Sequence, residues 1–152
     1  WRALPADGRY RDALAAAESL GFATLCTSLP DDQLLRLADV ARFARRPARA
    51  IEALDAVRTR FADSDAAATA AFERGRIALA QKAPDEAAKW LALYLRERPD
   101  GALVREATGR LIEALQGARQ LDEARDVARD YLARYPNGPH ADLATRVIAG
   151  PR

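Results

Sequence analysis

The hydrophobic positions of this chain repeat every 37 residues. The segment 85–99 returns as the segment 122–136, with alanine, tyrosine, leucine and proline at matching places. The same interval counted backwards from Ala87 reaches Ala50 and then Ala13. Within each copy the apolar residues lie three or four positions apart, which is the spacing of one face of an α-helix. The four stripes are Ala13, Ala17 and Leu20; Ala50, Leu54 and Val57; Ala87, Leu91 and Tyr94; and Ala124, Ala128 and Tyr131.

A helix of this length with one apolar face is not stable alone in water, so the copies are expected to stack on other helices. Strands are not expected, because no segment alternates apolar and polar residues convincingly and β-branched residues are sparse. The segment 22–29, which follows Gly21, fits either a short helix or a loop. The predicted helices cover residues 8–19, 32–44, 47–61, 65–81, 102–117 and 140–149, with two more around Trp90 and Tyr131.

The repeat predicts one domain that covers residues 1–152. Its length allows a continuous core, because a chain of this size buries about two thirds of its unfolded surface. The predicted divisions are an N-terminal half repeat at 1–30, three repeats at 31–64, 65–101 and 102–138, and a C-terminal capping helix at 139–152.

Composition narrows the classes of function. The chain has 49% hydrophobic residues and a net charge of +2, from 24 basic and 22 acidic residues, so it has no strong general attraction for nucleic acid or anionic lipid. A single cysteine excludes an internal disulfide and a thiolate metal cluster. No apolar run is long enough to span a bilayer. Because the chain starts at Trp1 and contains no methionine, we expect it to be a fragment or a processed product.

No residue pattern predicts catalysis, a metal site or a cofactor. His140 is the only histidine and stands at a predicted helix start, where a surface or capping role is expected. Gly75 and Gly109 lie inside predicted helices, so they are expected to allow close packing rather than to contact a phosphate. Cys26 is expected to be a small buried hydrophobe, because its local sequence lacks a basic neighbour. The chain is therefore predicted not to be an enzyme.

The charged residues are predicted to lie on solvated helix faces. Asp122 with Arg125 and Asp126 with Arg129 have the spacing of helical ion pairs, each worth about 0.3 to 0.5 kcal/mol. A basic cluster is interrupted by acidic residues and contains no aromatic platform, so nucleic-acid binding is disfavoured. The cluster consists of Arg42, Arg45, Arg46 and Arg49, with Arg36, Arg58 and Arg60 nearby.

The pattern resembles tetratricopeptide repeats, which have a small residue in the first helix, an alanine opening the second and a proline ending it. Gly75, Ala87 and Pro99 follow it at intervals of 12. Gly109 lies 15 residues before Ala124, so the first helix of that repeat or its turn is expected to be about three residues longer. Other matching positions are Ala38, Ala50 and Ala62 in the first repeat. The resemblance spans residues 31–137 and implies an all-α, right-handed solenoid of antiparallel helix pairs, about eight helices in all.

A narrower likeness lies in the segments 89–101 and 131–141, where a helix ends in a step such as Tyr135-Pro136. These segments are similar to the periplasmic repeat domains that follow FecR-type sigma-factor regulators. They resemble, less closely, repeats of outer-membrane-assembly lipoproteins and Tol-Pal coordinating proteins. This likeness implies a bacterial protein of the periplasm or cell envelope, although a cytoplasmic location stays open.

In tetratricopeptide proteins the first helix of each pair lines a concave groove that holds a partner segment. The resemblance therefore implies partner-binding residues on those helices. Phe43 and Phe72 could instead fill the core between repeats, whereas Arg76 and Arg110 must face water or a partner. The candidate site residues are Asp39, Arg42, Phe43, Phe72, Arg76, Leu79, Arg110 and Glu113, and Asp32, Leu35 and Glu106 are expected on the same face.

The expected function is that of a non-catalytic scaffold that binds a protein or peptide partner, with a possible place in sigma-factor regulation. The alternative is a self-association or spacer domain in envelope assembly. No nucleic-acid partner and no membrane insertion within this segment are expected. The partner's identity and the oligomeric state stay open.

Overall fold

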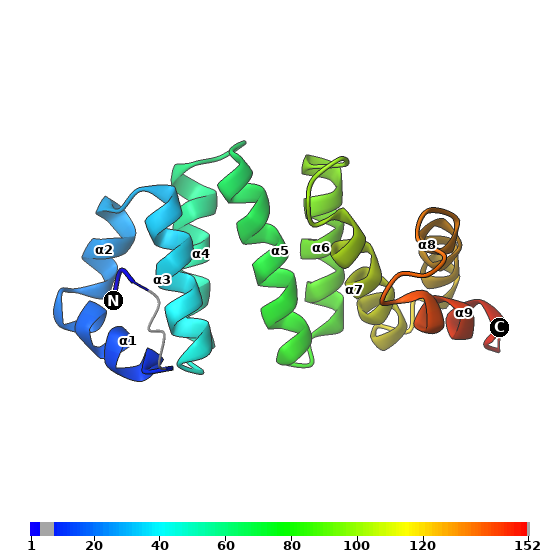
Figure 1. Ribbon diagram of the computed structural model, residues 1–152, viewed down its shortest axis with the longest axis horizontal. Coiled ribbons are helices and arrows are strands. Elements are labelled where there is room, and N and C mark those ends of the chain that lie inside the picture. Colours follow the sequence, from blue (N-terminus) through cyan, green and yellow to red (C-terminus); the bar gives the residue numbers. More distant parts are fainter. Residues whose placement is uncertain (4–7, 152) are drawn as a thin grey trace. The chain divides into compact units, whose positions relative to one another are not determined.

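Every regular element in the computed structural model, which describes residues 1–3 and 8–151, is an α-helix. The all-α prediction is confirmed. The described part contains nine helices rather than about eight, because the segment left open between helix and loop forms the short helix α2. The helices are α1 (Tyr10–Ser19), α2 (Phe22–Ser28), α3 (Asp31–Phe43), α4 (Pro47–Arg60), α5 (Asp65–Ala80), α6 (Pro84–Glu97), α7 (Val104–Gly117), α8 (Leu121–Arg134) and α9 (Ala141–Ala149) (Figure 1).

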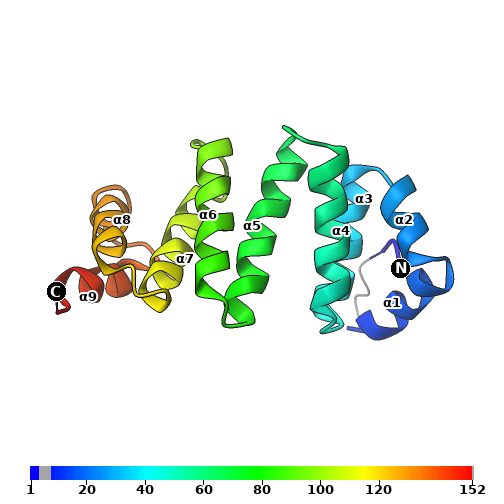
Figure 2. The ribbon, with the colours of Figure 1, turned by 180° about the vertical axis from the view of Figure 1, so that it is seen from behind.

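The chain divides into two compact units, unit 1 (Trp1–Ala70) and unit 2 (Ala71–Arg152), with the division inside α5. In unit 1, α3 packs against α4, and in unit 2, α6 packs against α7, as Figures 1 and 2 both show. Each unit is therefore built from neighbouring helices joined by short turns. The predicted repeat boundaries stay a prediction.

Three turns with the same backbone join the helices of each pair. Their central residues, Arg45, Lys82 and Arg119, are 37 positions apart and adopt left-handed φ angles of 60°, 58° and 60°. In each turn the next N–H closes the helix end by donating to a carbonyl five residues earlier, at 2.9 Å. Glycine is usual at such a position, because a side chain strains a left-handed backbone. In this chain a lysine or an arginine occupies the left-handed position in all three turns.

The repeated turn corrects one prediction about helix length. The turn that contains Arg119 is no longer than the other two, and α7 has 14 residues against 16 in α5. Counting 37 positions from Gly75 leads to Ile112 and not to Gly109. Gly109 is therefore a different structural position, and no insertion separates it from Ala124.

The core of unit 1 forms where α1 packs on α3 and α2 packs on α4. Leu14 and Ala17 of α1 are buried, but Leu20 is 63% exposed, so the stripe predicted for this helix is wrong at that residue. The cause is that α1 packs differently from the second helix of a later pair, so the step of 37 residues does not lead to an equivalent position. The larger buried side chains of this unit are Leu34, Leu37, Val40, Leu54 and Val57.

The end of α2 is held by an arginine from α4. Arg60 donates from Nη1 to the backbone oxygens of Cys26 and Leu29, at 2.9 and 2.7 Å, which satisfies carbonyls that a helix C-terminus leaves open. Cys26 itself is buried, as predicted. Burial, followed by the charge of Glu52, raises the pKa of its thiol to about 11.

The core of unit 2 confirms the packing role predicted for Gly75. A Cβ atom added there would lie 2.7 Å from Cγ of Leu91, so only glycine lets α5 approach α6 this closely. Ala87, Leu91 and Tyr94 are buried as the stripe predicts, and so are Ala124, Ala128 and Tyr131.

Two tyrosines hold the loops that follow α6 and α8. The Tyr94 hydroxyl accepts the N–H of Leu103, and the Tyr131 hydroxyl accepts the N–H of His140, both at 3.0 Å. Each oxygen also lies where the Cβ of a following glycine, Gly101 or Gly138, would otherwise be. The tyrosine, proline and glycine positions that recur after 37 residues thus belong to one structural motif, which joins the end of one hairpin to the start of the next helix.

Candidate partner-binding site

Three of the predicted site residues lie at the end of α3 in unit 1. Phe43 is 46% exposed, with its ring stacked on Tyr10 at a centroid distance of 4.8 Å. The Arg42 guanidinium lies 4.1 Å from the centre of the Phe43 ring and donates to Oδ1 of Asp39 at 3.2 Å. The structure therefore brings these three residues together around one exposed aromatic ring.

The predicted arginines of unit 2 pair with acids on their own helices. Arg76 is 3.3 Å from Oε1 of Glu73, and Nε of Arg110 is 3.1 Å from Oε1 of Glu106. Leu79 is only partly exposed. Both arginines stay accessible, but a partner would compete with an existing ion pair. Such exposed pairs are worth about 0 to 1 kcal/mol, so the competition is weak.

Phe72 is not available to a partner. Its side chain is 1% exposed, and its ring packs edge-on against Tyr94 at a centroid distance of 5.9 Å. Its inclusion among the partner-binding residues was wrong, and the alternative interpretation as a core residue holds. A large aromatic side chain in the first helix of a repeat fits the sequence pattern of a groove residue and also that of a core residue. Only the packing in the structure distinguishes these two roles.

His140 and Glu113 form one arrangement with Gly109. The His140 ring occupies the place where a Cβ of Gly109 would lie, with Cε1 only 2.8 Å from that position. Its Nε2 is 3.0 Å from Oε1 of Glu113, and its side chain is mostly buried. His140 is the N-cap residue of α9, as one expected role has it, but its side chain makes no capping hydrogen bond; the expected surface role is wrong, because the ring packs on α7. The packing role of Gly109 is confirmed.

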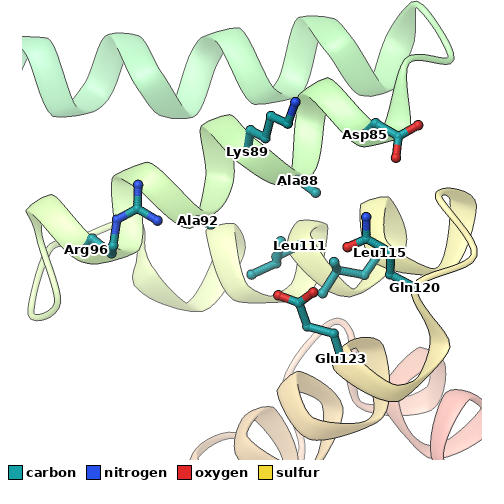
Figure 3. A pocket seen from close by; sticks show the side chains of 9 residues that line it. All are labelled: Asp85, Ala88, Lys89, Ala92, Arg96, Leu111, Leu115, Gln120 and Glu123. Atoms are coloured by element: carbon teal, nitrogen blue, oxygen red, sulfur yellow. The ribbon is translucent and has the colours of Figure 1, made fainter.

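A cleft that the sequence did not predict opens in unit 2 between α6, α7 and α8. It has a volume of about 510 Å³, which lies in the usual range for ligand-binding clefts, roughly 300 to 1,000 Å³. Small or apolar side chains from α6 and α7 form its floor, and charged or amide side chains form its rim. The floor contains Ala88, Ala92, Leu111 and Leu115; the rim contains Asp85, Lys89, Arg96, Gln120 and Glu123 (Figure 3).

The charges of this cleft change along α6. Asp85 and Gln120 lie at one end and Arg96 at the other, while Glu123 extends from α8 toward Leu111 (Figure 3). Among the described residues, no hydrogen bond or ion pair engages the side chains of Asp85, Arg96 or Glu123. A bound segment would thus meet Asp85 at one end, Lys89 and Glu123 in the middle and Arg96 at the other end.

The next repeat shows why the cleft is open at α6. The position 37 residues after Ala88 is Arg125, which is only 8% exposed. Its guanidinium pairs with Asp122 and donates to the backbone oxygen of Pro151. The predicted pair is confirmed, but the predicted solvated setting of Arg125 is wrong. An arginine stands on α8 where α6 has an alanine, and the cleft that Arg125 lines is smaller, at about 180 Å³.

The sequence contained a signal for the cleft. Ala88 and Ala92 form a second small stripe beside the buried stripe of α6, and charged residues flank it at helical spacing. A small stripe on a helix usually means close packing against another helix, so this pattern alone does not distinguish a filled contact from an open cleft. The position of α8 decides between them.

Short helical hairpins with the same turn every 37 residues are the architecture of a helical-repeat protein. The profile of the tetratricopeptide-repeat family matches residues 35–102. Nothing among curated protein sequences matches the chain. In the part of the chain that the structure describes, no helix is both long and apolar enough to cross a bilayer, and no three or more His, Cys, Asp or Glu residues are grouped to hold a metal ion.

Solved structures show the same fold. The crystal structure of nearly identical TPR-like repeats of a kinesin-light-chain-type protein from Podosopora anserina superposes with a TM-score of 0.71 at 16% identity. A variant of the same protein gives 0.72 at 15% identity. Both alignments cover 94% of this chain and 77% of the other. The fold is that of TPR-like helical repeats.

Proposed function

We propose that the chain is a non-catalytic scaffold that binds a peptide segment of a partner protein in the cleft between α6, α7 and α8. The single observation that carries this proposal is a cleft of about 510 Å³ whose rim presents charges of both signs, with Asp85 at one end and Arg96 at the other. Repeat scaffolds present such surfaces on rigid helices, so little conformational entropy is lost in the scaffold on binding.

The cleft determines the chemistry of the partner segment. A small apolar side chain fits between Ala88 and Ala92. Leu111 and Leu115 are only 6% and 1% exposed, so this side chain gains less than the ~1.5 to 3 kcal/mol of a fully buried one. A basic residue fits beside Asp85, and an acidic residue fits near Arg96. Charge order of this kind contributes to orientation and association rate more than to affinity. We expect an affinity near micromolar, about −8 kcal/mol.

The cellular setting that we propose is the bacterial envelope, with the periplasm as the compartment and sigma-factor regulation as one context. Support comes from the likeness of segments 89–101 and 131–141 to periplasmic repeat domains. Recovery of the endogenous protein from periplasmic and cytoplasmic fractions, each with a marker enzyme, would test this setting.

The experiment compares two matched double variants of the full chain. A random peptide library is selected against the wild-type protein, and the best peptide is then titrated by calorimetry. Lys89→Glu with Arg96→Glu changes the cleft. Arg76→Glu with Arg110→Glu changes the predicted first-helix face by the same net charge. Helicity and melting temperature are recorded for both.

We expect the cleft variant to lose at least tenfold in affinity, which is about 1.4 kcal/mol, while the first-helix variant stays within about threefold. The opposite pattern would move the site to the first helices, where the sequence placed it. Equal loss in both variants would show general charge attraction and would contradict both locations.

A further inference from the structure

A second cleft lies in unit 1, between α1 and the turn that joins α3 to α4. Its volume is about 380 Å³. Its walls carry three arginines and one glutamate around a small apolar floor. The lining residues are Arg11, Leu14, Ala15, Glu18, Ala44, Arg45 and Arg46.

Most arginines of the surrounding basic cluster are engaged within the protein. Arg42 bonds Asp39, Arg58 donates to the backbone oxygen of Ala67, and Arg60 closes the end of α2. These side chains are committed to contacts within the protein, although Arg58 and Arg60, which bond neutral carbonyls, keep their full charge.

The one acid of the cleft is also engaged. Glu18 accepts from Nε of Arg49 at 3.1 Å, and the same guanidinium bonds Glu52 at 2.8 Å. The hydrogen bonds that Arg49 donates, first to Glu52 and then to Glu18, raise its pKa. Because one guanidinium is shared by two carboxylates, this group keeps a net charge of −1, against the three positive charges of Arg11, Arg45 and Arg46.

Arg11, Arg45 and Arg46 remain. Within residues 1–3 and 8–151, none of the three side chains has an ion pair. Arg45 is held at its left-handed position by the α3–α4 turn, with its N–H donating to the backbone oxygen of Arg42 at 3.0 Å. Three cations therefore surround a floor made by Leu14 and Ala44.

From this arrangement we infer that the unit 1 cleft binds an acidic segment of a protein partner. Two or three carboxylates pair with the three guanidiniums, and arginine is suited to this because its planar fork matches a carboxylate. A small apolar residue of the segment covers the floor.

A nucleic acid fits the cleft less well. No aromatic ring lines it, so no base can stack there. An apolar floor formed by Leu14, Ala15 and Ala44 offers nothing to a phosphate, whereas it can be covered by a side chain of a peptide. Sugar–phosphate chains also need a continuous basic track, which the engaged arginines do not supply.

This inference goes beyond the proposed function, because the two clefts lie in different units and share no residue. Each can fail without the other. The α6–α7–α8 cleft takes a segment with both charges, whereas the unit 1 cleft takes a purely acidic one.

The probe is a fluorescent peptide of alternating glutamate pairs and single leucines, titrated by anisotropy into the full chain. Its neutral counterpart has glutamine in place of glutamate, and single-stranded oligo-thymidine of equal charge is the third ligand. The test variant is Arg45→Asn with Arg46→Gln. The matched control is Lys82→Asn with Arg119→Asn, which removes the same charge from equivalent turns outside the cleft; asparagine tolerates the left-handed backbone.

We expect the acidic peptide to bind at least tenfold more tightly than the neutral one, and binding to weaken with added salt. The test variant should lose about tenfold, and the control should change less than twofold. Three results would each overturn the inference. The control variant could lose as much affinity as the test variant, or the acidic peptide could bind no better than the neutral one. Oligo-thymidine could also bind more tightly than the acidic peptide and lose that binding on Arg45→Asn. Unchanged helicity of both variants excludes a folding defect.

Discussion

Replacing Gly109 by alanine tests the packing of His140 on α7. In an ordinary helix interior this change stabilises by about 1 kcal/mol, because alanine has the higher helix propensity. Here the new methyl group would overlap the His140 ring, so the ring must move. Overpacking of this kind costs about 1 to 3 kcal/mol. Displacement also removes the hydrogen bond to Glu113, worth about 0.5 to 1.5 kcal/mol.

The net effect of Gly109→Ala in the wild-type background is thus a loss of about 0.5 to 3.5 kcal/mol of unfolding free energy. In a His140→Ala background the obstructing ring atoms are absent. The same change should then stabilise by up to about 1 kcal/mol. The sign of the effect reverses, which a general loss of packing would not produce.

Urea unfolding measures all four proteins of this cycle. The chain has two tryptophans, so Trp1→Phe leaves Trp90 as a reporter that lies in unit 2. The free energies then refer to the unit that contains Gly109 and His140. If Gly109→Ala destabilises by the same amount in both backgrounds, the ring does not occupy the space beside Gly109, and the reasoning is refuted.

Three further predictions concern other parts of the structure. Ala88→Arg should fill the α6–α7–α8 cleft, and it should abolish binding of the selected peptide in calorimetry without lowering the melting temperature. Tyr131→Phe removes the acceptor for the His140 N–H, so unit 2 should lose about 0.5 to 1.5 kcal/mol in urea unfolding, with unchanged stability contradicting the bond. Cys26 should react slowly with a thiol reagent at pH 8, because burial raises its pKa to about 11; unfolding in urea should restore the rate, and fast reaction of the native chain would refute its burial.

The helices and most of their buried faces could be predicted because the repeat interval sets the register of each copy. Ala50, Ala87 and Ala124 are all buried, as counting by 37 requires. The count failed at α1, where Leu20 is exposed, since a periodic pattern does not tell a first helix from a second one. The alignment of Gly109 with Gly75 was also wrong, because the register of the repeat was set by the glycines and not by the turn between the two helices.

The three cations at 45, 82 and 119 were a better marker of register. They were overlooked because a left-handed position is normally recognised by glycine. His140 and Arg125 were misjudged for a different reason. A polar residue near a helix end is usually exposed, and only the neighbouring helix shows that the ring lies on α7 and that the guanidinium fills a contact. Contacts between residues far apart in sequence have no local signature.

Repetition and binding place opposite demands on the same helices. Positions that recur unchanged, such as Tyr94 and Tyr131, are buried and hold the repeat together, so they cannot distinguish one partner from another. Selectivity for one partner over another must come from positions where the repeat copies differ. Ala88 against Arg125 is such a difference, and it goes with a cleft of about 510 Å³ beside α6 and a smaller one of about 180 Å³ beside α8. Comparing the copies position by position, and asking which differences leave space or unpaired charge, therefore leads to the surfaces where partners can bind.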